Sequence, residues 1–123
     1  MNVKLGANLI FVSDLERAKH WYENNFGMET IQYRPPEFLK MKLGGNIFYI
    51  ETKSDKRAEG FKEVYIGGRS SMVFEVANIQ EVIRELKEKG VKIVVEPVQQ
   101  FWGGWNAVIA DPDGNEFILD DDK

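Results

Sequence analysis

The sequence contains no cysteine and a single histidine, His20. Without cysteine there can be no disulfide, no thiolate metal site and no cysteine nucleophile. No apolar run approaches the roughly 18 residues that a transmembrane helix requires, and the first residues lack a charged stretch followed by an apolar one. We therefore expect a cytoplasmic protein that makes no membrane contact.

Neither sign of charge dominates the sequence. The formal net charge is −4, from 16 Lys and Arg against 20 Asp and Glu, and no basic block stands out. This balance argues against a nucleic-acid partner. Hydrophobic residues make up 43% of the 123 residues, which is typical of a soluble globular domain. The run Asp120-Asp121-Asp122 is expected to be a solvated chain end.

The sequence does contain an internal repeat of two copies. Residues 12–15 return 64 residues later as residues 76–79, and each is followed by a helix-like run that ends at a glycine, Gly27 or Gly90. A strand-like sequence at 45–50 likewise matches 114–119, at an offset of 69. Two copies of one unit predict a pseudo-twofold domain whose functional cleft lies where the copies meet.

Each copy is predicted to contain a strand, a helix and three further strands. The first copy gives a strand at 3–12, a helix capped by Ser13 and closed by Gly27, and extended runs at 29–34, 38–43 and 47–52. The second gives a strand at 70–77, a helix capped by Asn78 and closed by Gly90, and extended runs at 91–96, 105–110 and 116–120.

These elements predict an α+β fold of two βαβββ modules in a single domain. Module one spans residues 1–52, a charged linker 53–69, and module two 70–123. A four-stranded mixed sheet with one helix buries only one of its faces. We expect the two sheets to be placed edge to edge, curving into a cup.

Several motifs in this order resemble the vicinal oxygen chelate superfamily. This superfamily includes glyoxalase I, extradiol dioxygenases, fosfomycin-resistance enzymes and bleomycin-resistance proteins. The motifs are residues 12–18 with Trp21-Tyr22 and 26–28, residues 74–76, and residues 101–105 running into Asp111-Pro112-Asp113-Gly114-Asn115. The similarity covers nearly the whole chain outside the linker.

The resemblance implies four inward positions that hold a divalent metal, with His or Gln on each first strand and Glu on each last strand. Carried over by motif, these positions are Ala7, Tyr49, Ser71 and Ile118. A methyl group, a phenol, a hydroxyl and an alkyl group cannot replace imidazoles and carboxylates as ligands. Shifting the alignment by two residues, which keeps the same sheet face, does not supply four ligands either. We therefore expect no metal and no other cofactor.

Aromatic side chains and a few polar ones remain as candidates for binding a ligand. These residues are Tyr33, Phe38, Tyr49, Ser71, Glu75, Trp102 and Trp105. Trp102 and Trp105 flank Gly103-Gly104, where rigid rings can line a groove that the backbone approaches closely. Phe38 is equally compatible with the core. Bleomycin-resistance-like members use aromatic walls to sequester planar drugs, and an acidic chain favours a cationic planar compound through cation–π contacts.

The leading hypothesis is a metal-free protein that binds a small planar molecule, such as an antibiotic, without being an enzyme. The alternative is a metal-dependent lyase, isomerase or dioxygenase with an unusual site built from Glu51, Glu75 or Glu116. A third possibility is an accessory dimer without a ligand. A homodimer is expected because open sheet edges and faces need covering. The sequence leaves open the ligand and whether modules are exchanged between chains.

Overall fold

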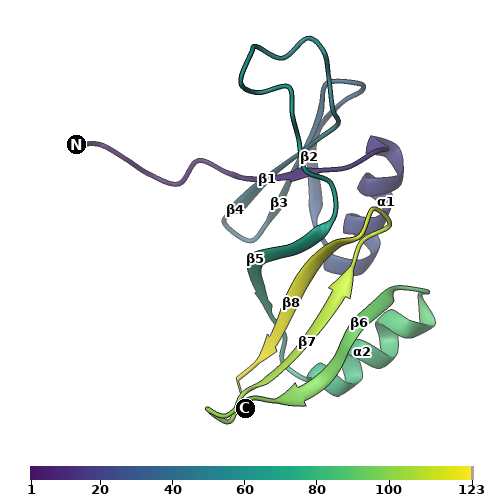
Figure 1. Ribbon diagram of the computed structural model, residues 1–123. Helices are drawn as coiled ribbons and strands as arrows, with labels where there is room; N and C mark the ends of the chain where they lie inside the picture. Colours follow the sequence, from purple (N-terminus) through teal and green to yellow (C-terminus); the bar gives the residue numbers. More distant parts are fainter. Residues whose placement is uncertain (123) are drawn as a thin grey trace. The chain divides into compact units, whose positions relative to one another are not determined.

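The computed structural model describes residues 1–122 and divides into two compact units, with the boundary between Ile66 and Gly67 (Figure 1). The first unit contains β1 (Asn8–Phe11), α1 (Leu15–Phe26), β2 (Glu29–Arg34), β3 (Phe38–Leu43) and β4 (Asn46–Glu51). Its sheet has the order β1-β4-β3-β2, with β1 parallel to β4 and the other pairs antiparallel.

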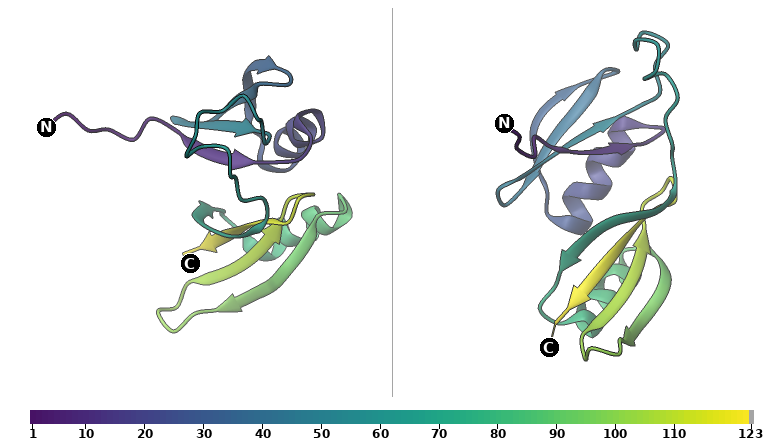
Figure 2. Two further views of the ribbon diagram at one scale, coloured as in Figure 1. Left: turned by 45° about the horizontal axis from the view of Figure 1, so that its top comes forward. Right: turned by 60° about the vertical axis from the view of Figure 1, so that its left-hand side comes forward.

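The second unit repeats this arrangement. It contains β5 (Gly68–Glu75), α2 (Ile79–Glu88), β6 (Lys92–Gln99), β7 (Trp105–Ala110) and β8 (Asn115–Asp121). The sheet order is β5-β8-β7-β6, with β5 parallel to β8. In each unit the helix covers one face of its own sheet (Figure 2). The predicted α+β fold of two βαβββ modules is confirmed.

The core of each unit lies between the helix and the sheet. Side chains of α1 with helical spacing are buried over β2, β3 and β4, and those of α2 over β6, β7 and β8. On β3, β4 and β8, every second residue is buried along much of the strand, as expected where one face meets a helix. The buried residues include Leu15, Ala18, Tyr22, Leu39, Met41 and Ile50 in the first unit, and Ile79, Ile83, Leu86, Ala107, Ile109 and Phe117 in the second.

The first strand is shorter than predicted. The prediction of a strand over 3–12 is wrong for residues 3–7, because β4 offers backbone partners only to Asn8–Phe11. Val3 and Leu5 are exposed in the segment that precedes β1. At the other boundary, β5 begins at Gly68, so the second unit includes residues 67–69, which the sequence places in the linker.

The helix caps confirm one prediction and correct another. Asn78 caps α2, accepting a hydrogen bond from the backbone N–H of Glu81 at 3.2 Å. The cap of α1 is Asp14, whose side chain accepts from the backbone N–H of Arg17 at 3.0 Å. Ser13, the predicted cap, instead accepts a hydrogen bond from the Arg17 guanidinium at 2.8 Å. Either residue type satisfies a free helix amide, so the sequence did not separate two adjacent candidates.

The turn between β7 and β8 is built around a buried carboxylate. Asp111 accepts hydrogen bonds from the backbone N–H groups of Asp113 and Asn115, both at 2.9 Å, and from the Asn115 side chain at 2.8 Å. The Asn115 side-chain oxygen in turn accepts from the Gly67 N–H at 2.8 Å. The turn therefore fixes the point at which the chain enters the second unit.

The prediction of a solvated chain end at residues 120–122 is wrong for Asp121, whereas Asp122 is exposed. Asp120 and Asp121 belong to β8, and Asp121 is only 8% exposed. Its carboxylate accepts a hydrogen bond from the backbone N–H of Ile79, the first residue of α2, at 3.0 Å. A carboxylate at a helix N-terminus is favourable, and here it ties β8 to α2.

Candidate functional site

The face of each sheet that lies opposite its helix is called the open face below. Residues on a strand alternate between the two faces, so the neighbours of the buried positions point to the open face. In the first unit these neighbours combine rings, cations and carboxylates. They include Leu9, Phe11, Phe38, Lys40, Tyr49 and Glu51.

The aromatic rings on the open face of the first unit contact one another and positively charged side chains. Phe38 and Tyr49 are arranged edge to face, with ring centroids 5.8 Å apart. The Lys40 ammonium lies 5.6 Å from the centroid of the Tyr49 ring. The Arg57 guanidinium lies 5.1 Å from the Phe11 ring. Cations over ring faces are attracted by the negative face of the π system, so these rings already carry partners of positive charge.

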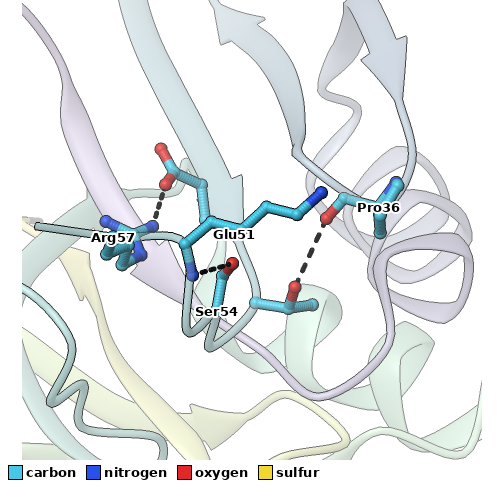
Figure 3. A network of polar contacts seen from close by, with 6 residues as sticks. Pro36, Glu51, Ser54 and Arg57 are labelled. Carbon is cyan, nitrogen blue, oxygen red and sulfur yellow. Dashed lines mark hydrogen bonds and ion pairs between the residues drawn. The ribbon is translucent and has the colours of Figure 1, made fainter.

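Arg57 reaches this face from the segment that follows β4, residues 52–66 (Figure 3). The backbone N–H of Arg57 donates to the Ser54 carbonyl at 3.3 Å, and the Lys56 N–H donates to the Ser54 hydroxyl at 3.2 Å. This turn folds the chain back, and the Arg57 guanidinium forms an ion pair with Glu51 at the end of β4. The Thr52 hydroxyl donates to the Pro36 carbonyl at 3.4 Å.

A hollow of about 450 Å³ lies beside this network, and we call it the Arg57 hollow. Its lining includes Pro36, Glu37, Glu51, Lys53, Lys56 and Arg57. Three cations thus meet two carboxylates, although the whole chain is acidic. A second hollow of about 470 Å³ shares Pro36, Thr52 and Lys53 and extends to Asp14 and Tyr33 near the start of α1.

The open face of the second unit is aliphatic. Val73, Val95 and Val98 are exposed there, and Val108 and Ile118 lie between them on β7 and β8. These side chains form a continuous apolar strip without any aromatic ring.

A polar cluster lies at one end of this strip. The Gln100 side chain donates to the Asn106 side-chain oxygen at 3.2 Å, and Asn106 donates to Asp120 at 2.6 Å. Glu75 is the register neighbour of Asp120 and is exposed. The second open face therefore carries carboxylates at this end, whereas in the first unit the equivalent carboxylate, Glu51, is paired with Arg57.

Of the residues predicted to bind a ligand, the structure brings one pair into contact and places a second pair, without contact, on one side of a strand. Phe38 and Tyr49 share the open face of the first unit, and Ser71 and Glu75 share the exposed side of β5 in the second. Tyr33 lies elsewhere, because it pairs across the strands with the buried Leu39 and therefore faces α1. The Lys19 ammonium of α1 lies 5.9 Å from its ring.

The two predicted tryptophans take different positions. Trp105 pairs with the buried Asp121 across β7 and β8, so its half-buried ring lies on the face that α2 covers. Trp102 lies in the turn between β6 and β7 and is 56% exposed, in edge-to-face contact with Phe101 at 4.8 Å. A Cβ atom on Gly104 would lie 2.9 Å from the Trp102 indole nitrogen, so the glycine allows this ring to pack against the backbone.

Sequence reasoning missed Phe11, Lys40 and Arg57 as parts of this site. The alternation of Lys40 and Lys42 with the apolar Leu39 and Met41 could have placed Lys40 on the open face. No comparable signal exists for Arg57, which lies in a charged segment without periodicity.

The four positions that the superfamily resemblance implies for a metal do not fit one. Tyr49 is adjacent to Leu9 on the first open face, and Ile118 is adjacent to Val73 on the second. Neither pair offers a side chain that binds divalent metals strongly, and Ala7 and Ser71 add none. Within residues 1–122, no three side chains of His, Cys, Asp or Glu gather closely enough to hold an ion.

The carboxylates proposed for the alternative metal site are placed separately. Glu51 is paired with Arg57, and Glu116 accepts a hydrogen bond from the Arg69 side chain at 2.8 Å. Glu75 lies exposed on β5. The two ion pairs direct Glu51 and Glu116 toward structural cations.

Another carboxylate on the α1 side of the first sheet has a perturbed titration. The Thr30 hydroxyl donates to Glu23 at 2.8 Å, and this hydrogen bond is the main reason why the pKa of Glu23 is lowered from its ordinary value. The Lys19 ammonium, 3.3 Å from the same carboxylate, lowers it further. Both partners favour the ionised form.

Two mixed four-stranded sheets, each covered by one helix and formed by successive halves of the chain, define a protein of the duplicated βαβββ class. The family model described as the Glyoxalase/Bleomycin resistance protein/Dioxygenase superfamily matches residues 4–119. The chain belongs to this superfamily.

Individual proteins are similar to this chain in sequence or in fold. The uncharacterized protein YetH of Bacillus subtilis (strain 168) is 26% identical over 120 residues, covering 94% of this chain and 96% of the relative. A superfamily member from Sphaerobacter thermophilus DSM 20745 is similar in structure, with a TM-score of 0.83, 24% identity and 98% of each chain covered. A lactoylglutathione lyase from Agrobacterium tumefaciens has a TM-score of 0.79 at 16% identity, with 98% and 95% covered. At these identities the solved structures establish the fold.

Within residues 1–122, neither helix has the length and apolarity needed to cross a bilayer.

Proposed function

We propose that the protein binds a small planar molecule on the open face of its first unit, without a metal, and sequesters it rather than transforming it. One observation carries the proposal: Phe38 and Tyr49 form an edge-to-face pair on a sheet face that no helix of this unit covers, with Lys40 over the Tyr49 ring. Aromatic rings that are held by a sheet offer a flat apolar surface at low entropic cost.

The charges on this face narrow the class of ligand. Lys40 and Arg57 already lie over Tyr49 and Phe11, so a further cation would meet positive charge. A planar compound with an acidic substituent, including an antibiotic of that type, is favoured by the same arrangement. The proposal therefore replaces the cationic ligand expected from net charge with a neutral or acidic one.

The proposal includes a homodimer. Strands β1, β2, β5 and β6 each pair on one side only within their own sheet, and their outer edges offer unpaired backbone groups. Light scattering at micromolar concentration should give twice the mass of one chain. A monomer mass would contradict the dimer and leave ligand binding to be judged separately.

Calorimetric titration of chelator-treated protein with planar compounds, in matched pairs with and without an acidic group, tests the function. Binding should persist without metal and be tighter for the acidic member of each pair. Tyr49→Ala should weaken binding by about 2- to 10-fold, the cost of about one aromatic contact. Lys40→Met should reduce the difference in affinity between the acidic and the neutral compound of each pair.

Tyr65 supplies a matched control, because it is an exposed tyrosine in the segment that follows β4. Tyr65→Ala should bind like the wild type. Binding that appears only after a divalent metal is added, or equal losses in Tyr49→Ala and Tyr65→Ala, would overturn the proposal.

A further inference from the structure

We propose that the Arg57 hollow is a binding site for a small anionic group, either a carboxylate or a phosphate-like oxyanion, held by Arg57, Lys53 and Lys56. The site lies between the Pro35–Pro36 turn and the residues that follow β4. Arg57 also lies beside the Phe11 ring on the open face, but the hollow can bind an anion without the planar ligand proposed for the Phe38–Tyr49 surface.

The charges that line the hollow favour an anion. Glu51 is already neutralised by Arg57, which leaves Lys53 and Lys56 facing the single further carboxylate of Glu37. The two ammonium groups form no ion pair or hydrogen bond with any side chain in the described part of the protein. A local excess of positive charge in a chain of net charge −4 concentrates anions at that point.

The Arg57 guanidinium is held in place and has N–H donors available for an anion. Its side chain is only 22% exposed, yet a guanidinium carries five N–H donors and Glu51 supplies the one carboxylate paired with it. The Nε–H group is buried and has no acceptor within residues 1–122. The Phe11 ring, 5.1 Å away, supports the guanidinium. A fixed guanidinium with donors to spare matches the paired oxygens of a carboxylate or phosphate.

The neighbouring hydroxyl adds a donor. Ser54 lines the hollow, and its oxygen accepts the hydrogen bond from the Lys56 N–H at 3.2 Å. A hydroxyl that accepts from the backbone keeps its own O–H for donation. The same turn thus presents a hydroxyl, two ammonium groups and a guanidinium to one volume of about 450 Å³.

The arginine Nε–H resonances of the ¹⁵N-labelled full chain report on this site directly. The chain has five arginines, so the spectrum of Arg57→Lys identifies the Arg57 signal by its loss. Sodium phosphate and sodium acetate are titrated separately against sodium chloride at matched ionic strength. We expect a saturable shift of the Arg57 signal in the millimolar range with phosphate, acetate or both, and none with chloride. The two anions distinguish a tetrahedral oxyanion from a carboxylate.

Variants separate the binding role from a structural one. The double variant Lys53→Gln/Lys56→Gln changes only exposed side chains, so the fold should persist while the dissociation constant rises at least threefold. Arg57→Gln should raise it at least tenfold, because hydrogen bonds to charged groups are the strong ones. For Arg57→Gln, binding is followed by the backbone amides of residues 52–57. Lys62→Gln is the matched control, since Lys62 is paired with Glu59 in the same segment, and it should change nothing.

Two results would overturn the inference: an Arg57 signal that moves equally with chloride, or a double variant that binds phosphate and acetate as the wild type does. Failure here is distinguishable from failure of the proposed function. If planar compounds bind through Tyr49 and simple anions do not shift Arg57, only the anion site is lost. If the anions bind and no planar compound does, only the proposed function is lost.

Discussion

The two units have the same strands and the same buried faces, but their open faces differ at equivalent positions. Phe48 and Ile50 of β4 correspond to Phe117 and Leu119 of β8, and all four are buried under a helix. On the opposite face of the two sheets, the residues at equivalent positions differ in chemical type. Tyr49 corresponds to Ile118, and their cross-strand neighbours are Lys40 and Val108.

The carboxylates show the same contrast. Glu51 corresponds to Asp120 at the end of the last strand of each unit. The first is paired with the cation of Arg57, and the second accepts a hydrogen bond from the neutral amide of Asn106. The repeated helix-facing positions are constrained by packing in both units. The open faces are free of that constraint, so the differences between them are where specialised binding should be sought.

The largest expected effect concerns a ring on a helix-facing position. Trp105→Ala should lower the free energy of unfolding by about 2–3 kcal/mol, because the ring is half-buried on the α2 side of the sheet. Chemical denaturation measures this loss. Trp102→Ala, at a position that is 56% exposed, is the control and should cost less than about 1 kcal/mol. Lost ligand binding with unchanged stability in Trp105→Ala would return this ring to the ligand site.

Two equivalent asparagines at the hairpin turns give the next effect. Asn115→Ala should cost about 2 kcal/mol, because it removes hydrogen bonds to Asp111 and to the Gly67 N–H. Asn46, its counterpart in the first unit, is exposed and makes one long bond of 3.4 Å to the Leu43 carbonyl. Asn46→Ala should therefore cost less than about 0.5 kcal/mol. Equal melting temperatures for the two variants would contradict the difference between these turns.

The helix caps should behave alike in both units. Asp14→Ala and Asn78→Ala are each expected to cost about 1 kcal/mol, since each removes the acceptor of a first-turn amide. Ser13→Ala, beside the cap of α1, should cost less than about 0.5 kcal/mol. Thermal melts of the three variants test this order. A greater loss in Ser13→Ala than in Asp14→Ala would show that the cap is Ser13.

The smallest effect is confined to the first unit and concerns pH. Thr30→Val removes the hydrogen bond that lowers the pKa of Glu23, so this pKa should rise toward its ordinary value of about 4.3. A carboxyl group whose pKa is lowered in the folded protein stabilises the fold at pH values above its ordinary pKa. That stability is lost as the pH falls through the pKa of the folded state.

The variant should therefore lose less stability on acidification than the wild type, by under about 1 kcal/mol. Side-chain carboxyl NMR titration of both proteins measures the change. An unmoved Glu23 titration would assign the shift to Lys19 instead.

Most of the fold follows from the alternation of apolar residues. The predicted bounds of β2, β3 and β7 are confirmed, and in β3 the buried Leu39 and Met41 alternate with less buried residues, as in a sheet with one buried face. The prediction of a strand over residues 3–7 is wrong for a reason that pattern cannot reveal. Those residues have strand-like side chains, but a strand also needs a backbone partner, and the pairing of β1 with β4 begins only at Asn8.

The site was less accessible from sequence. Gly103-Gly104 interrupts the alternation between β6 and β7, so the face that receives Trp105 was not fixed until the register with Asp121 was known. Arg57 belongs to a charged segment in which any residue could have been solvated. Its place beside Glu51 and Phe11 depends on how one turn at Ser54 folds, which is a tertiary property.

The hydrogen bonds of Gly67 have a consequence for how the chain can be divided. Its amide is held by Asn115, the next amide by Gly114, and a Cβ atom at Gly67 would lie 3.2 Å from the Asp113 carbonyl. Its φ of +91° also favours glycine. The second unit is thus held by its own hydrogen bonds from its first residue, Gly67, onward. A fragment that begins at Gly67 would therefore retain β5, α2, β6, β7 and β8 together with the hydrogen bonds that hold its first residues.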